Sequence, residues 1–304
     1  EALRLLGENV GPFADIDRIM RDAAGFRMGP FELLDLTGLD VSQPVMESIY
    51  HQYFQEPRYR PSPLAAQRLT AGVLGRKTGR GFYVYPDGKM ATIAEPAAPA
   101  ARPGRVWISQ ATPDFAEQVR NLAAKAGVAL DEGQRPGADS LCVVTPLGRD
   151  ATSHCVAEGL DPVRTVAVDC LFGLDRRRTV AATPVTGPAW RDAALGLFSA
   201  DGVPATLIRD SAGLVAQRIV ATIVNIGCDI AQQGIASPED IDRAVTLGLG
   251  YPKGPLGFGD ALGPRRVMAV LEAMQEFYGD PRYRPSPWLK RRAMLGLSLL
   301  TPEA

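Results

Sequence analysis

Residues 57–63 read PRYRPSP, and residues 281–287 repeat this string letter for letter. Further matches occur in the same order at an offset of 225 or 224 residues. They are DIDR at 15–18 and 240–243, Gly29-Pro30 and Gly254-Pro255, Asp35 and Asp260, and Gly38 and Gly263. This distance is far longer than the period of about 20–50 residues in a solenoid. The sequence therefore predicts a duplicated domain, copy 1 (residues 1–85) and copy 2 (residues 210–304), with another region between them.

Composition excludes several classes of protein. The chain has 304 residues and a formal net charge of −1, so it is long enough for two or three domains and lacks the basic excess of a nucleic-acid binder. The basic clusters at 176–178 and 290–292 are interpreted as solvated faces. Four cysteines without a CxxC pair suggest neither a disulfide framework nor a metal site, which favours a reducing, cytoplasmic setting. We expect neither a membrane span nor a signal peptide.

Copy 1 is predicted to be helical throughout. In the proline string, Ser62 is expected to cap the last helix and Pro63 to occupy its first position. Two interpretations of the string's arginines stay open: salt bridges at the surface or between helices, or contacts with an anionic ligand or partner. The tail at 74–85 (LGRKTGRGFYVY) has three glycines in seven residues, which permit tight turns, but it is not a P-loop. Copy 2 ends LGLSLL at 295–300, so the tail is expected to be special to copy 1.

The start of the chain falls within a helical pattern. In copy 2 this pattern begins near Leu214 and runs to Ile230, with apolar residues at helical spacing. At the offset of the repeat, Glu1 aligns with Ile226, halfway along that helix. We therefore expect the chain to be a piece of a longer protein.

The region between the copies has a different pattern. Residues 86–104 are rich in alanine and proline without a period, which predicts a linker. From residue 105 to 209, short apolar runs such as LCVV at 141–144 and TVAV at 165–168 alternate with helical segments. This alternation predicts a small, mostly parallel sheet with helices.

The motifs of copy 1 resemble the C-terminal helical domain of the 3-hydroxyacyl-CoA dehydrogenase family. They are DID at 15–17, GFRMGPFEL at 25–33, DL at 35–36, GLD at 38–40 and the tail at 74–85. The resemblance implies two all-α domains of the 6-phosphogluconate-dehydrogenase C-terminal type flanking a reduced Rossmann-like domain, as in long bacterial members. It also implies an NAD-binding domain ahead of copy 1 and a dimer contact made by the helical domains.

The family's catalytic residues have no match in the middle region. Family members use a histidine, oriented by a glutamate, to exchange the hydroxyl proton while hydride passes to NAD, with a serine and an asparagine assisting. Asp169 stands at the histidine position, Ala181 near the glutamate and Gln217 at the asparagine. The turn after the first strand reads SQAT at 109–112 and lacks the glycines that let a pyrophosphate approach. We expect this region neither to catalyse nor to bind NAD, and NAD to be held by the missing N-terminal domain.

Only two histidines occur in the chain. His51 lies beside Tyr50 and Tyr53 in a copy 1 helix and is interpreted as a surface or core-edge residue. His154 has Glu158 four residues later, which is typical of a pair on one helix face. Neither is interpreted as the catalytic base.

Three hypotheses follow for function. In the first, the chain is the C-terminal part of an NAD-dependent enzyme that oxidises 3-hydroxyacyl-CoA to 3-oxoacyl-CoA in fatty-acid or phenylacetate-type catabolism, and it is inactive alone. Copy 1 would then line the acyl pocket through Phe26, Met28, Pro30 and Phe31, with plain helix packing as the equal alternative. In the second, compatible hypothesis, the copies form an intrachain pseudo-dimer that serves assembly, and a homo-oligomer stays open. The third is an acyl-CoA-binding pseudoenzyme.

Overall fold

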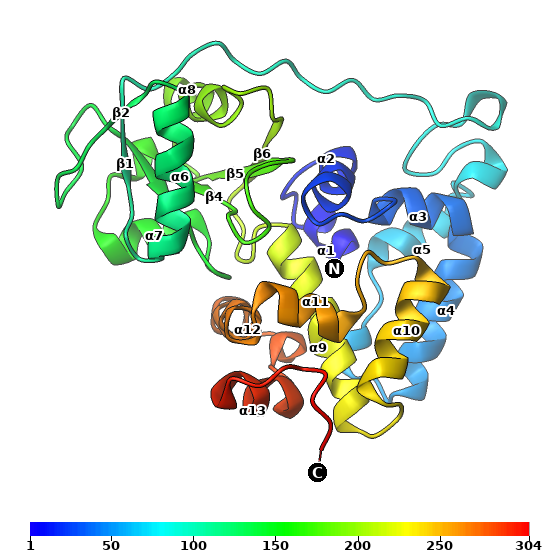
Figure 1. The fold of residues 1–304 in the computed structure, drawn as a ribbon. Coiled ribbons are helices and arrows are strands. Elements are labelled where there is room, and N and C mark those ends of the chain that lie inside the picture. Colours follow the sequence, from blue (N-terminus) through cyan, green and yellow to red (C-terminus); the bar gives the residue numbers. More distant parts are fainter. Residues whose placement is uncertain (304) are drawn as a thin grey trace.

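The computed structural model describes residues 1–303 and has a mixed α/β architecture. Figure 1 shows the two helical copies together, with the N-terminus between them, and the sheet with its helices beside them. An extended segment from the end of copy 1 crosses to the first strand, where the sequence predicts a linker. No helix among residues 1–303 combines the length and apolarity that a membrane crossing requires.

The helices of the two copies recur in the same order. Copy 1 contains α1 (Ala2–Gly7), α2 (Phe13–Arg18), a π-helix (Ile19–Ala23), α3 (Pro30–Thr37), α4 (Leu39–Gln52), a 3-10 turn (Pro57–Tyr59) and α5 (Pro63–Thr70). Copy 2 contains α9 (Ala216–Gln232), α10 (Pro238–Leu249), α11 (Pro255–Leu262), α12 (Pro264–Tyr278), a 3-10 turn (Pro281–Tyr283) and α13 (Pro287–Leu295). At the offset of the sequence repeat, α3 corresponds to α11, α4 to α12, and α1 to the end of α9.

The middle region forms one six-stranded sheet in the order β2-β1-β3-β4-β5-β6. Its strands are β1 (Arg105–Ile108), β2 (Ala129–Leu130), β3 (Leu141–Val144), β4 (Thr165–Val168), β5 (Arg178–Ala182) and β6 (Ala205–Arg209). Its helices are α6 (Pro113–Lys125), α7 (Ala151–Glu158) and α8 (Pro188–Phe198). All pairings are parallel except that of β4 with β5. Every residue of β3, β4 and β5 is buried, which explains the runs of apolar or small residues in β3, in β4 and in β5 after Arg178.

An aspartate holds the start of the third helix in each copy. Asp17 accepts hydrogen bonds from the backbone N–H groups of the second and third residues of α3, at 2.8 and 3.0 Å. Asp242 accepts the same two bonds from α11, at 2.8 and 2.7 Å. A Cβ atom on Gly29 or Gly254 would lie 2.2 Å from the aspartate carboxyl group. The repeated glycine is therefore required by the close approach of the carboxylate to the helix N-terminus, where a negative charge is stabilised.

A second repeated aspartate corrects the expectation about the tail. Asp35 accepts the backbone N–H groups of Phe82 and Tyr83, both at 2.8 Å. Asp260 accepts the backbone N–H of Leu299 at 2.7 Å and the hydroxyl of the preceding serine at 2.5 Å. The prediction that copy 2 has no counterpart to the tail is wrong at this point, because its shorter end supplies donors to the same carboxylate.

The two proline strings contact each other. Arg58 donates to a backbone carbonyl of the second string at 3.1 Å, and Arg282 donates to a backbone carbonyl of the first at 2.6 Å. Arg58 also pairs with Asp229 on α9, and Arg282 pairs with Glu1 at 2.6 Å. Both arginines are buried, with exposed fractions of 7% and 3%. Of the two interpretations of these arginines, the contacts favour salt bridges between helices.

Half of the residues in the basic clusters are buried, whereas Arg176, Lys290 and Arg291 are exposed. Arg177 is buried and pairs with Asp22 of copy 1 at 2.7 Å and with Glu95 of the linker at 2.5 Å. Arg178 is buried and pairs with a carboxylate after α8 at 2.7 Å. Arg292 is buried with its guanidinium 3.2 Å from the centre of an indole ring of α13. The solvated interpretation is wrong for these three arginines, and Arg177 joins the sheet to copy 1 and to the linker.

Candidate functional site

Asp169 and Gln217 meet beyond the carboxyl end of β4. Asp169 directly follows β4, and Gln217 lies in the first turn of α9. The Gln217 side-chain amide donates to Asp169 Oδ1 at 2.9 Å and to the Pro146 carbonyl at 3.0 Å. Its oxygen accepts the Gly148 N–H at 2.8 Å. The structure thus brings together two of the three positions expected to be degenerate, with the glutamine fully buried.

The third position, Ala181, lies on β5, the strand that pairs with β4. Ala181 pairs with Ala167 of β4, two residues before Asp169. Burial raises the pKa of Asp169 to about 6, against the opposing effect of the hydrogen bond from Gln217. Asp169 is only 5% exposed and also accepts the Leu171 N–H at 3.0 Å. A general base must reach the proton that it removes, and a carboxyl held in this way presents almost no surface to a substrate.

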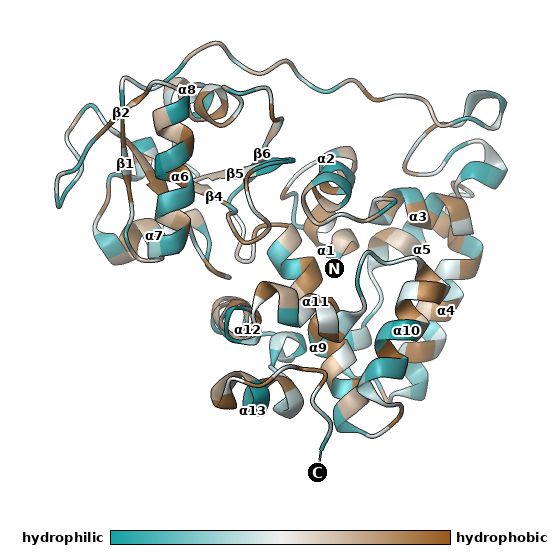
Figure 2. Ribbon diagram, viewed as in Figure 1, coloured by the Kyte–Doolittle hydropathy of each residue, from teal (hydrophilic) through white to brown (hydrophobic). Residues whose placement is uncertain are grey.

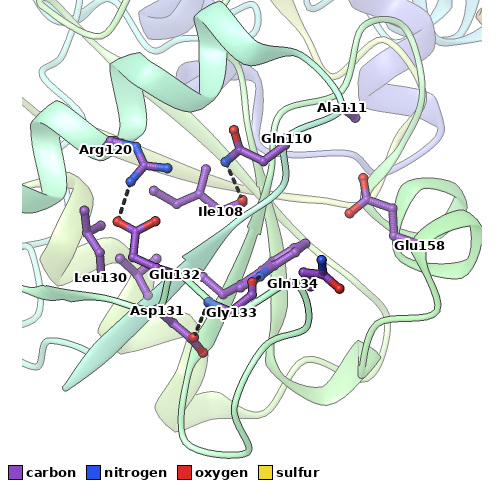
Figure 3. Close-up of a pocket in the computed structure, with 12 residues that line it drawn as sticks. Ile108, Gln110, Ala111, Arg120, Leu130, Asp131, Glu132, Gly133, Gln134 and Glu158 are labelled. Carbon is purple, nitrogen blue, oxygen red and sulfur yellow. Dashed lines mark hydrogen bonds and ion pairs between the residues drawn. The ribbon is translucent and has the colours of Figure 1, made fainter.

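The turn after β1 occupies the place where a dinucleotide-binding fold holds the pyrophosphate. It borders a cavity of about 320 Å³ at the carboxyl ends of β1 and β2, shown in Figure 3. Ser109 Oγ donates to the Glu158 carboxylate at 2.5 Å and accepts the Ala111 N–H at 3.2 Å. The Gln110 side chain folds back onto the Ile108 carbonyl at 3.0 Å. A pyrophosphate would meet a carboxylate and side chains here in place of glycine N–H groups, so the turn does not fit one.

Asp131, the acidic residue after β2, makes hydrogen bonds within its own loop. A carboxylate near this place contacts the ribose in dinucleotide-binding folds. Asp131 instead accepts the N–H groups of Gly133 and Gly137 at 3.1 and 2.7 Å and the Ser140 hydroxyl at 2.6 Å. These bonds hold the loop between β2 and β3, and they lower the pKa of Asp131, with the Ser140 hydroxyl as the largest cause. Asp131 therefore has a structural role in the loop.

His154 forms a cluster with Glu158 and Ser109, of which the sequence indicated only the pair of His154 with Glu158. Its Nε2 lies 2.9 Å from Glu158 Oε1, as the spacing predicts, and the same oxygen accepts the Ser109 hydroxyl. Burial lowers the pKa of His154, while Glu158 acts in the opposite direction. His51 is exposed, with Nδ1 3.2 Å from a Gln55 side-chain nitrogen. Within residues 1–303, no group of three or more His, Cys, Asp or Glu side chains has the arrangement of a metal site.

The four residues expected to line an acyl pocket do not share one surface. Phe31 is fully buried in the core of copy 1. The ring of Phe26 packs 4.9 Å from that of Tyr251 in copy 2, so it lies where the copies meet. Met28 is exposed, and Pro30 begins α3. Their part in binding a substrate stays a prediction.

Comparison with known proteins places these features in a family. The sequence model described as "3-hydroxyacyl-CoA dehydrogenase, C-terminal domain" matches residues 1–85 and again residues 213–298. The 3-hydroxyadipyl-CoA dehydrogenase of Escherichia coli K12 is 34% identical over 97% of this chain, which spans 57% of that protein. The human mitochondrial hydroxyacyl-coenzyme A dehydrogenase is 39% identical over 85 residues, 28% of this chain and 27% of its own length.

A solved structure agrees with these sequence matches. The crystal structure of 3-hydroxybutyryl-CoA dehydrogenase from E. coli K12 superposes with a TM-score of 0.76 at 30% identity, covering 97% of this chain and 57% of that one. The chain therefore spans little more than half the length of its long relatives. The family expected from the motifs of copy 1 is confirmed: this chain belongs to the 3-hydroxyacyl-CoA dehydrogenases.

Proposed function

We propose that the chain forms the C-terminal part of an NAD-dependent 3-hydroxyacyl-CoA dehydrogenase and is inactive alone. The names of its relatives support a 3-hydroxyacyl-CoA substrate that is oxidised to the 3-oxoacyl-CoA. Fatty-acid or phenylacetate-type catabolism is the setting that we propose. A cytoplasmic location belongs to the same proposal, because four free, buried cysteines suit a reducing compartment.

The buried contact between Asp169 and Gln217 is the main support for the proposal that the chain is inactive alone. Oxidation of an alcohol by hydride transfer needs a group that accepts the hydroxyl proton. The middle region offers an enclosed carboxyl, a glutamine whose amide makes three hydrogen bonds, and, on the neighbouring strand, the methyl group of Ala181. The catalytic base and the bound NAD would accordingly lie in another domain of the complete enzyme, with copy 1 beside them.

The two copies would serve assembly as well as the site. We propose that copy 1 and copy 2 arose by duplication and flank a reduced Rossmann-like domain (residues 105–209) behind a linker (residues 86–104). The equivalent bonds of Asp17 and Asp242 support the duplication, and the reciprocal bonds of Arg58 and Arg282 support an intrachain pseudo-dimer.

An activity assay tests the main proposal. The chain is mixed with NAD and 3-hydroxybutyryl-CoA, and NADH formation is followed; no turnover is expected. Turnover that disappears in Asp169→Asn would contradict the proposal, whereas turnover unchanged by this substitution would point to a contaminating enzyme. Calorimetry with the same CoA ester addresses the pseudoenzyme alternative, which micromolar binding by the isolated chain would favour.

A further inference from the structure

The junction between α3 and α4 in copy 1 is covered by the tail. After α5 the chain turns back over this junction through a 3-10 turn (Arg76–Thr78). The Leu39 N–H donates to the Leu74 carbonyl at 2.9 Å. Lys77 Nζ pairs with the Asp40 carboxylate at 2.6 Å. The tail therefore closes this place with a short turn and one ion pair.

The turn packs closely against the helical module. A Cβ atom on Gly38 would lie 2.2 Å from Lys77 Cε, and a Cβ atom on Gly75 would lie 2.3 Å from the Asp35 carbonyl oxygen. Gly75 also has a φ of 126°, which residues with a side chain rarely adopt. Glycine is therefore required at position 75, and the module forms a place that accepts a turn beginning with glycine.

Copy 2 leaves the corresponding place open. A cavity of about 640 Å³ lies between the junction of α11 with α12 (residues 260–266) and the end of α13 with the residues that follow it (293 and 296–298). Figure 2 shows α11, α12 and α13 near the C-terminus, with hydrophobic and hydrophilic positions along them. A Cβ atom on Gly263, the counterpart of Gly38, would meet nothing closer than Arg266 Cδ at 3.9 Å. The volume is within the range of ligand pockets.

The shorter end of copy 2 explains the opening. Leu299 donates its N–H to Asp260 at 2.7 Å, in the place where Phe82 donates to Asp35 in copy 1. The residues between the last helix and this bond are 71–81 in copy 1 but only 296–298 in copy 2. Copy 2 therefore lacks the segment that forms the covering turn, although it keeps the carboxylate beside it.

The charge at this junction is reversed between the copies. Arg265 stands in copy 2 at the position of Asp40. Its Nε donates to the Ala293 carbonyl at 3.0 Å, and no carboxylate within residues 1–303 pairs with it. A guanidinium with free N–H groups on the wall of a cavity suits a carboxylate. An occupant of this cavity should therefore carry an acid where the tail carries Lys77.

We propose that the cavity beside Arg265 is a docking site for a partner polypeptide, which inserts a glycine-containing turn with an acidic side chain. Copy 1 shows the equivalent contact within the chain with the charges exchanged, because Lys77 of its turn meets Asp40 of the module. A second copy of this chain is not the expected occupant, since its tail presents Lys77 and Arg265 would repel it. The site depends only on contacts inside the two copies, so it is independent of the enzymatic activity proposed above.

Peptide binding to this chain tests the docking site. The probe is a fluorescently labelled peptide of residues 74–80 with Lys77→Glu, and its matched control keeps the native lysine. Fluorescence anisotropy gives the two dissociation constants. The acidic peptide should bind at least about fivefold more tightly than the native one, because attraction replaces repulsion at a partly exposed charge pair. Binding to copy 1 by displacement of its own tail would give the opposite preference, since Asp40 attracts the lysine.

Substitutions at position 265 show whether this arginine recognises the acid. Arg265→Gln keeps a side chain that can donate to the Ala293 carbonyl, and it should make the two peptides bind equally. Arg265→Asp should reverse the preference in favour of the native lysine. Arg291→Asp makes the same charge change at an exposed arginine of α13 that does not line the cavity, so it should leave the preference unchanged. Because Arg265 is exposed, the urea midpoints of its variants should stay close to that of the wild type.

Four results would overturn the docking site. The first is that neither peptide binds at a concentration of about 1 mM. The second is a preference for the acidic peptide that persists in Arg265→Asp. The third is displacement of the probe by glutarate as effectively as by unlabelled peptide, because the cavity would then be a site for small carboxylates. The fourth is a dimer of the chain that Arg265→Asp abolishes, because a second copy would then occupy the cavity.

Discussion

Replacement of Arg58 by methionine tests whether the two proline strings hold the helical copies together. The substitution keeps an unbranched apolar chain but removes the ion pair with Asp229 and the hydrogen bond to the second string. Leaving one partner of a fully buried pair uncompensated costs about 3–5 kcal/mol. The Asp229 side chain keeps 16% exposure, which screens part of this cost, and the Arg284 carbonyl keeps its hydrogen bond from the Asn225 side chain at 2.9 Å. We expect a loss of about 3 kcal/mol.

Urea unfolding followed by circular dichroism measures this loss through the midpoint of the helical transition. Arg60→Met is the matched control, because Arg60 belongs to the same string but is exposed, and it should change stability by less than about 0.5 kcal/mol. Combining Arg58→Met with Asp229→Asn removes the charge on both sides of the pair. The double variant should be more stable than the sum of the single changes by about 1–2 kcal/mol.

Two outcomes would refute this reasoning. If Arg58→Met unfolds at the same urea concentration as Arg60→Met, the contact between the strings contributes nothing measurable to stability. If the effects of Arg58→Met and Asp229→Asn simply add, the carboxylate is not the partner that stabilises this arginine. Either result would also weaken the proposal of an intrachain pseudo-dimer.

Two further predictions concern buried carboxylates. Since burial raises the pKa of Asp169 to about 6, above its ordinary value, the folded chain binds the proton more tightly than the unfolded chain. Wild-type stability should fall by about 2 kcal/mol relative to Asp169→Asn as pH rises from about 4 to 7, and a constant difference in urea midpoints would contradict this. Gly29→Ala places a Cβ against Asp17 and should lower stability by about 2–4 kcal/mol through the lost helix-start bonds. Gly104→Ala, whose Cβ meets nothing within 4 Å, is its control in thermal unfolding, and equal melting temperatures would reject the argument.

The repeat made much of the helical architecture predictable. A serine before proline in PRYRPSP indicates a helix start, and α5 begins at Pro63 with the Ser62 hydroxyl accepting from Leu64 N–H. The antiparallel direction of β5 relative to β4 could also be predicted from the sequence. Only nine residues join β4 to β5, whereas a parallel crossover needs about a dozen or more. A mostly parallel sheet with one antiparallel pair follows from that length.

Contacts between distant segments could not be predicted in this way. A run of three arginines is typical of a solvated face, but Arg177 is buried because Asp22 and Glu95 approach it from separate parts of the chain. Ser109 and Glu158 are 49 residues apart, and no periodicity links them. Such pairs depend on how the sheet region, the linker and copy 1 pack together, which local patterns do not encode.

The two copies keep the same internal bonds and differ where each meets its neighbour. The carboxylates of Asp17 and Asp242 hold equivalent helix starts, so a change at either would disturb the module itself. Val41 and Arg266 occupy equivalent positions on an outer face, where the choice of residue depends on what packs against it. Arg266 pairs there with Asp114 of the sheet region. The divergence between the copies therefore follows their different surroundings, while the repeated residues maintain the module itself.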